Sequence, residues 1–416
     1  MRLSLGSIGA LLLTQAAFAL TPATLVGPDL ARQRVNIQSL RNGRLTYFDS
    51  NRDLRTGDLQ NFAQIRDLPG SKGLAQTNAQ TDAQRNAQTD AQKTRPDSAP
   101  QQVLELTDGQ RLIGSWQGAA GNGQTLRWRH PLLGSVAIDL EQVAAIGLST
   151  DPPHLGPLTS DTLWLANGDT VDGVLASLRD DAIEWYAAGR GDQTQMLVLP
   201  LSRVRAVRLA TAPPAQPTGH LIWTRDGSRL RATNLRLASA LMMQPTLVPA
   251  PASDDPGPGH LVQLPLAQVV RIDLASTRGR LLDLTTIEMR VTDGGYVFEV
   301  PMPSRVEASS IRMHAPVTVR FDLPQGTSRF AAVAELDLDV EQRLQGWANM
   351  DLIVKSEDQI VARHRLSASH PRVEVNVAIG GKSLIIEVAE AMNGPVMDRL
   401  RLRDPVLYVR SPLGSD

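Results

Sequence analysis

Acidic side chains alternate along one stretch near the C-terminus, where they could serve hydrolytic chemistry. Glu335, Asp337, Asp339 and Glu341 are spaced two residues apart, so in a strand all four share one face. Hydrolysis of a glycosidic bond needs a pair of carboxyl groups, one of them with a pKa raised by its surroundings. The neighbouring sequence offers no apolar cleft for that purpose. We therefore expect a solvated face or a weak cation site here, and no catalysis.

The composition argues against several other kinds of chemistry. The chain of 416 residues contains 0 cysteines, which excludes thiolate metal sites, a cysteine nucleophile and disulfides. Its formal net charge of −1 argues against nucleic acid as a partner. The sequence "GAAGNG" (118–123) lies in a predicted hairpin, so it does not form a phosphate loop between a strand and a helix. We expect no cofactor, and nothing indicates a structural calcium ion.

Residues 1–19 have the pattern of a secretory signal peptide. Arg2 supplies the positive start, an apolar run continues to Ala16, and Ala17-Phe18-Ala19 fits the cleavage pattern. The run is too short to span a bilayer, and no later stretch approaches ~20 apolar residues. We expect an exported protein, periplasmic or extracellular, with no membrane span after signal cleavage.

A hairpin pattern recurs between residues 103 and 276. It occurs in LELTDGQRLIGSW (104–116), LWLANGDTVDGVL (163–175) and LIWTRDGSRLRAT (221–233). Alternating apolar residues around an Asp-Gly or Asn-Gly step predict a two-residue turn, because glycine tolerates positive φ. Each copy closes with Leu-x-x-Val-x-x-Ile/Val, as in IDLEQVAAIGL (138–148). Such units are typical of small SH3-like or Sm-like β-barrels, or of one continuous β-array.

These patterns divide the chain into segments. We predict a signal peptide (1–19), a degenerate N-terminal β-repeat (20–72), a disordered low-complexity linker (73–102), β-repeats 1, 2 and 3 (103–150, 161–211 and 219–276) and a C-terminal β-sandwich (281–410). In the degenerate repeat we match IQSLRNGRLTYF (37–48) to the hairpin, and Leu59, Phe62 and Ile65 to the closing positions. The polar Ala-Gln-Thr linker cannot bury enough surface to offset its ordering entropy. The repeats are expected to contact other proteins.

The pattern changes near residue 280 to a series of alternating strands. They are TVRFDLP (318–324), RFAAVAELDLD (329–339), MDLIVKSEDQIVARHRLS (350–367), RVEVNVAIG (372–380), KSLIIEVAEA (382–391) and RLRDPVLYV (401–409). Strands joined by loop-length connections fit an antiparallel β-sandwich.

The step Met313-His314-Ala315-Pro316, followed by a strand ending in DLP and then by RF, resembles the NPCBM family of novel putative carbohydrate-binding modules. The resemblance covers about 281–410, and repeats before such a module are similar to exported planctomycete-type proteins. It implies a galactose-binding-like jelly roll. It also implies family-signature roles for His314, Ala315, Pro316, Arg329, Phe330 and Asp398.

Sugar binding requires an aromatic face and fixed polar groups. Trp347 is the candidate platform, although it could equally plug the core at the sandwich edge. The polar candidates near it are Asn349, Asp351, Arg343 and Arg363. His314 could contact sugar directly, or it could tie a loop carbonyl to a neighbouring turn through its ring nitrogens.

The sequence thus predicts an all-β protein, with SH3/Sm-like β-barrel repeats followed by a jelly-roll sandwich. We expect an exported, non-catalytic protein that binds glycan at the cell surface or in the periplasm. The alternative is a structural or adhesive scaffold whose β-repeats mediate protein–protein interaction. A glycoside hydrolase is the least favoured interpretation.

Overall fold

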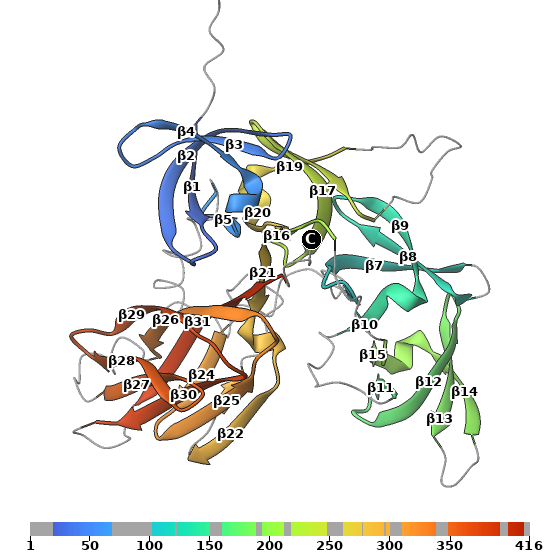
Figure 1. The fold of residues 1–416 in the computed structure, drawn as a ribbon. Helices are drawn as coiled ribbons and strands as arrows, with labels where there is room; N and C mark the ends of the chain where they lie inside the picture. The colour runs from blue at the N-terminus through green and yellow to red at the C-terminus, as the bar shows by residue number, and fades with distance from the viewer. Residues whose placement is uncertain are drawn as a thin grey trace, which may run out of the picture.

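The structure is a computed structural model that describes residues 20–68, 102–120, 123–149, 160–188, 194–211, 218–247, 261–276, 278–294, 297–299, 310–337, 348–391 and 398–411. Within these residues, four five-stranded units precede a two-sheet sandwich (Figure 1). The predicted fold class is confirmed. Over the same residues, no helix is long and apolar enough to cross a membrane. The predicted signal peptide lies outside the described residues, as does the predicted linker apart from Gln102.

Each unit has five strands, with a short 3-10 turn before the fifth. The N-terminal unit contains β1 (Thr21–Val26), β2 (Arg32–Arg41), β3 (Arg44–Phe48), β4 (Leu54–Asp58) and β5 (Gln64–Arg66). Unit 1 contains β6 (Gln102–Leu106), β7 (Arg111–Ala120), β8 (Thr125–His130), β9 (Gly134–Asp139) and β10 (Val143–Gly147). Unit 2 contains β11 (Asp161–Leu165), β12 (Thr170–Leu178), β13 (Ala182–Ala188), β14 (Thr194–Pro200) and β15 (Val204–Arg208). Unit 3 contains β16 (His220–Thr224), β17 (Arg229–Leu237), β18 (Ala240–Pro245), β19 (Val262–Pro265) and β20 (Val269–Asp273).

The turn glycines adopt positive φ as expected, but the predicted turn length is wrong. In unit 1, Gly109 has a φ of 86°, and the Leu106 N–H donates to Gln110 O at 2.9 Å, so four residues link β6 to β7. The Asp108 carboxylate accepts from the Gln110 N–H at 3.0 Å, which favours this longer turn over a two-residue one.

The N-terminal unit carries its Asn-Gly step one hairpin later than the other units. Asn42 and Gly43 (φ 51° and 71°) form a two-residue turn between β2 and β3, not between the first and second strands. Our match of residues 37–48 to the first hairpin was therefore shifted by one hairpin. The closing pattern does lie at the 3-10 turn and β5, with Ile65 fully buried.

Each of the two middle units is built around one tryptophan. Trp128 in unit 1 and Trp185 in unit 2 have no exposed surface. A Cβ at Gly173 would lie 2.5 Å from Trp185 Nε1 and 2.1 Å from Tyr186 O, so only glycine lets β12 pass over this ring.

The units pair through their last strands into one continuous array. Antiparallel β10 and β15 join units 1 and 2, and antiparallel β5 and β20 join the N-terminal unit to unit 3. Units 1 and 3 meet where β7 and β17 pair. The twenty strands form a single connected sheet over one hydrophobic core. Of the two predicted arrangements, separate small barrels or one continuous β-array, the structure has five-stranded units joined into one array.

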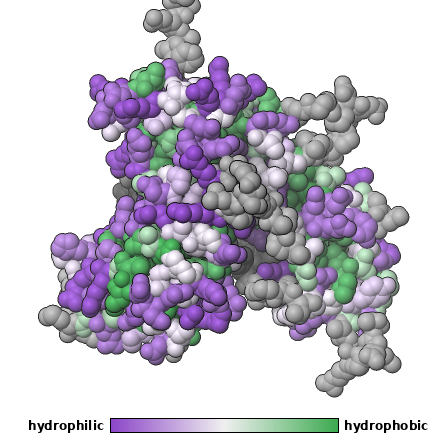
Figure 2. Space-filling model, viewed as in Figure 1, coloured by the Kyte–Doolittle hydropathy of each residue, from purple (hydrophilic) through white to green (hydrophobic). Residues whose placement is uncertain are grey.

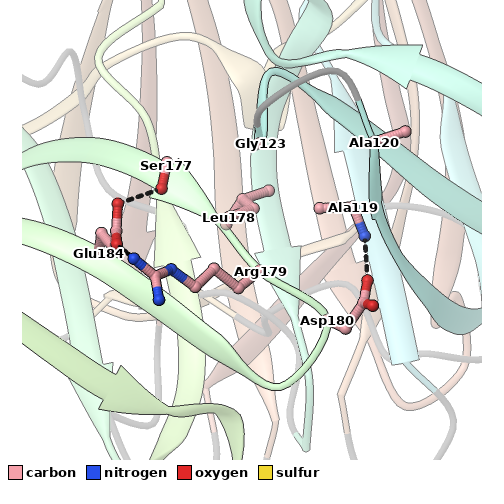
Figure 3. Close-up of a pocket in the computed structure, with 8 residues that line it drawn as sticks. All are labelled: Ala119, Ala120, Gly123, Ser177, Leu178, Arg179, Asp180 and Glu184. Carbon is pink, nitrogen blue, oxygen red and sulfur yellow. Dashed lines mark hydrogen bonds and ion pairs between the residues drawn. The ribbon is translucent and has the colours of Figure 1, made fainter.

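A hollow of about 450 Å³ lies between units 1 and 2 (Figure 3). Its acidic groups already have partners: Asp180 accepts from the Ala119 N–H at 3.0 Å, and Glu184 contacts Ser177 and Arg179. The hollow is therefore better described as a hydrogen-bonded junction than as a ligand site.

The C-terminal sandwich has two antiparallel sheets. Its strands are β21 (Gly279–Asp283), β22 (Met289–Gly294), β23 (Val297–Glu299), β24 (Ser310–His314), β25 (Val317–Asp322), β26 (Thr327–Leu336), β27 (Asn349–Ser356), β28 (Gln359–Ser367), β29 (Arg372–Ala378), β30 (Ser383–Glu390) and β31 (Arg399–Arg410). The β31 sheet has the order β23-β24-β31-β26-β29, with β21 also paired to β31, and the β30 sheet has the order β22-β25-β30-β27-β28. Phe321 and Phe330 lie in the core between them. The predicted segment 350–367 is a hairpin that turns at Glu357 (φ 55°).

The sandwich is fixed to the N-terminal unit and to unit 3 by a largely buried group of charged side chains. Asp404 Oδ2 lies 2.8 Å from Arg66 Nη1, and Asp404 Oδ1 lies 3.8 Å from Arg271 Nη1 of unit 3. Burial alone would raise the pKa of Asp404, but the two guanidinium groups outweigh it and lower that pKa. A small apolar cluster that includes Leu30 and Tyr408 seals the same junction. The sandwich therefore has a defined place on the array.

Candidate functional site

One end of the sandwich brings several predicted residues together. β24 ends at His314, β25 begins at Val317, β27 begins at Asn349, and Asp398 directly precedes β31. Glu390 ends β30 beside Met350 at the start of β27. Because neighbouring strands are antiparallel, these strand ends lie together at the same end of the sandwich.

The signature loop closes this end of the sandwich. The Ala315–Pro316 peptide is cis, and the Ala315 N–H donates to Asp398 O at 3.0 Å. His314 Nδ1 lies 2.8 Å from Ala315 O, so this nitrogen carries a proton and donates it. The histidine thus ties a loop carbonyl, which is the structural alternative that the sequence left open.

Asp398 is buried and only half satisfied. Its Oδ1 accepts from the Asn349 N–H at 3.0 Å. Its Oδ2 and the Oδ1 of Asn349 are also buried, and neither accepts a hydrogen bond within the described residues. Burial raises the pKa of Asp398, against the hydrogen bond from Asn349 and the charge of His314. Unpaired buried acceptors lower the stability of the folded state.

A hollow of about 330 Å³ lies at the same end. It is lined by Asp293, Gly294, Pro316, Val317, Thr318, Glu387, Val388, Ala389 and Glu390. Apolar floor residues with carboxylates and a hydroxyl around them are the groups that hold the C–H faces and hydroxyls of a sugar. Sequence reasoning missed Glu390 and Asp293. The available signal was their place at strand ends beside the Pro316 loop.

Asp351 and Arg363 lie elsewhere, on the outer face of the β30 sheet. The Asp351 carboxylate receives Arg363 at 2.7 Å and Arg365 at 2.8 Å, and its side chain is only 7% exposed. The hydrogen bonds from Arg365 and Arg363 outweigh burial and lower the pKa of Asp351 to about 2. This carboxylate is therefore already occupied. Sequence reasoning missed Arg365, although it shares a strand face with Arg363.

The remaining predicted residues are distributed as follows. Phe330 is fully buried in the core, and Arg329 hydrogen bonds to Asn376 at 3.1 Å on the opposite face of β26. Trp347 and Arg343 lie outside the described residues. Those two predictions remain predictions.

The alternating carboxylates do not form a metal site in the described part of the chain. Over those residues, no group of three or more His, Cys, Asp or Glu side chains could hold a metal ion. Glu335 and Asp337 instead face arginines of neighbouring strands. Asp339 and Glu341 lie outside the described residues.

Several solved structures are similar to this chain at low sequence identity. No family model matches the chain, and no curated protein matches it. A CBM51 module from a Clostridium perfringens family 95 glycoside hydrolase, solved with methyl-galactose, is 15% identical with a TM-score of 0.26, over 30% of this chain and 99% of that module.

Two other matches also contain CBM51 modules. Tandem modules of a Streptococcus pneumoniae family 98 glycoside hydrolase are 11% identical (TM-score 0.26), over 74% of this chain and 88% of theirs. The CBM51-2 and INT domains of Clostridium perfringens ZmpB are 11% identical (TM-score 0.27), over 45% of this chain and 43% of theirs. These likenesses leave the ligand of this chain open, and the NPCBM resemblance stays a prediction.

Proposed function

We propose that the protein is an exported, non-catalytic glycan-binding protein whose site is the sandwich end around His314, Asn349 and Asp398. The hollow at this end of the sandwich, lined by Asp293, Thr318 and Glu390, is the observation that carries the proposal. Sugar hydroxyls can donate hydrogen bonds to its carboxylates. The resemblance of residues 281–410 to a carbohydrate-binding family supports the same assignment.

The arrangement of the carboxylates supports binding without catalysis. In addition to burial, Glu390, which lines the hollow, raises the pKa of Asp398 through its charge, whereas His314 lowers that pKa. Asp398 Oδ1 accepts the Asn349 N–H and the side chain is fully buried, so this carboxylate orients the loop. Glu390, which lines the hollow, would hold a sugar hydroxyl in place.

The test is glycan binding by the full-length protein. We expect a glycan array to reveal ligands whose affinity falls at least about tenfold in Glu390→Ala, because one charged acceptor is lost. Glu288→Ala is the matched control, since Glu288 is an exposed carboxylate before the other end of β22. A folded protein that binds no glycan, or equal loss in both variants, would refute the proposal.

A second candidate function, protein–protein interaction through the repeats, is favoured by one surface. Val174, Tyr186 and Met196 lie opposite one another across β12, β13 and β14 and are 57%, 43% and 48% exposed. Val198 on β14 is also exposed, and hydrophobic surface is visible on unit 2 among hydrophilic residues in Figure 2.

The equivalent row of unit 1 is polar. Ser115, Arg129 and Ser135 occupy the matching places across β7, β8 and β9. The apolar row of unit 2 is therefore not a requirement of the unit's fold. Sedimentation of the full-length protein beside Tyr186→Ser tests this candidate. If the wild-type protein stays monomeric over the measured concentrations, the interaction proposed for this surface is not self-association.

A further inference from the structure

The outer face of the β31 sheet carries an unbalanced set of arginines. Ile311, Met313, Leu400 and Leu402 point into the core. The alternate residues of β24 and β31 therefore point outward, as do those of β29. They include Arg312, Arg372, Arg399, Arg401 and Arg403, which we call the guanidinium face.

The arrangement of this face opposes the stability of the sheet. Arg312 lies directly opposite Arg401, and Arg401 and Arg372 lie on either side of Glu335. Across β24, β31, β26 and β29, the residues that lie side by side are therefore Arg312, Arg401, Glu335 and Arg372. Like charges directly opposite each other destabilise a sheet. Their presence here calls for a role beyond folding.

The carboxylates on this face are fewer than its arginines, and one of them, Glu374, pairs with Arg32 of the N-terminal unit. Asp337 lies 3.1 Å from Arg312 Nε and 3.5 Å from Arg401 Nε, and Glu335 Oε2 lies 3.5 Å from Arg403 Nη1. Within the described residues, these ion pairs do not extend to Arg372 or Arg399. Arg372 and Arg399 are exposed. The face therefore keeps exposed positive charge that the carboxylates named here do not pair.

The opposite sheet shows that the sandwich does not require such a surplus. On the β30 sheet, Lys355 pairs with Glu387 at 2.6 Å, and Asp322 pairs with both Arg290 and Arg320. Asp351 similarly holds two arginines. Each of these lysine and arginine side chains of the β30 sheet therefore has an acidic partner.

We propose that the guanidinium face binds an acidic polysaccharide, one that carries carboxylates along its chain. Guanidinium groups bind carboxylates in a forked, charge-assisted geometry. The interspersed Glu335 and Asp337 can accept hydrogen bonds from sugar hydroxyls, whereas they would repel the dense charge of a nucleic-acid backbone. This surface is separate from the sandwich-end hollow, whose lining is acidic, and it goes beyond the function proposed for that site.

The test measures retention of the full-length protein on immobilised polygalacturonate and on its methyl-esterified, neutral form. We expect retention on the acidic form only, falling as salt rises from about 50 to 200 mM, because charge pairing is screened. Arg399→Gln/Arg403→Gln should weaken binding about tenfold or more. Neither residue is buried, so the fold should survive.

The matched control is Arg290→Gln/Arg320→Gln, which removes the same charge from the β30 sheet. Equal weakening in the control, retention on the neutral polymer, or equally tight binding of a DNA duplex would overturn the proposal. The Glu390→Ala variant separates the two sites. If it loses array ligands but keeps polygalacturonate, both proposals stand. If array binding is absent altogether while polygalacturonate binding depends on Arg399 and Arg403, only the sandwich-end proposal fails.

Discussion

Stability of the array should fall with decreasing pH because of His130. This side chain ends β8 and is only 1% exposed. Its Nδ1 accepts the N–H groups of Leu132 and Leu133, both at 3.2 Å, so Nε2 carries the proton and donates to Ser228 Oγ of unit 3 at 3.1 Å. A second proton would have to enter at Nδ1, against two donors. His130 therefore holds units 1 and 3 together in its neutral form.

The magnitude follows from the pKa of His130. Burial lowers that pKa from 6.5 to about 4, partly opposed by Asp226. A lowered histidine pKa means that the unfolded chain takes up a proton between pH 6.5 and 4 while the folded protein does not. The stabilisation is full above pH 6.5 and is lost as pH falls to 4. At about 1.36 kcal/mol per pKa unit, the loss is about 3 kcal/mol.

The assay is urea unfolding, followed by tryptophan fluorescence, of wild type and His130→Gln from pH 7.5 to pH 4. The wild-type protein should be the more stable at pH 7.5, and its advantage should shrink by about 3 kcal/mol at pH 4. His220 also has a pKa lowered to about 4 by burial, so His220→Gln is an independent control with its own loss. An advantage of wild type over His130→Gln that stays constant with pH would refute the reasoning.

Three further predictions concern stability. Asp404→Ala removes the carboxylate shared by Arg66 and Arg271, although Arg66 keeps Gln64 and Arg271 keeps Asp273 as partners, and it should lower the unfolding free energy by about 1.5–3 kcal/mol, measured by urea unfolding at pH 7. Gly173→Ala places a methyl group against Trp185 and should cost about 2 kcal/mol or more, seen as a lower melting temperature, whereas an unchanged value would show that β12 can shift. The ionised Asp351 carboxylate, held mainly by Arg365, stabilises the folded protein above the pKa that Asp351 has in the unfolded chain, and this stabilisation is lost as pH falls towards 2. In Asp351→Asn, the free energy of unfolding should therefore depend less on pH between about 4 and 2. Parallel curves of unfolding free energy against pH for the two proteins would contradict the assignment.

Local features of the fold were predictable because they depend on neighbouring residues. The glycine at 109 adopts the positive φ that its Asp-Gly step implied, and the alternating strands of the sandwich follow their side-chain pattern. The turn length was missed because the Asp108 side chain, and not only the glycine, shapes the backbone.

Features that depend on distant residues were not predictable. Nothing in residues 64–66 indicates that β5 pairs with β20, because the unpaired backbone groups of an exposed strand can hydrogen bond to any other exposed strand. Of the candidate site, the sequence supplied His314, Asn349 and Asp398 but could not separate them from Asp351, which folds onto a different surface. A one-dimensional spacing does not show which side of a sheet a side chain reaches.

The pairing of β5 with β20 also sets an order of events during synthesis. Ile65 lies opposite Ile272, so the edge of the N-terminal unit finds its partner only after some 200 further residues have been made. Units 1 and 2, which pair through β10 and β15, are complete earlier and can associate first. During that interval the β5 edge is open to strands of other chains. The first unit to be translated is thus the last to be enclosed, and the nascent chain is most prone to aggregation until unit 3 emerges.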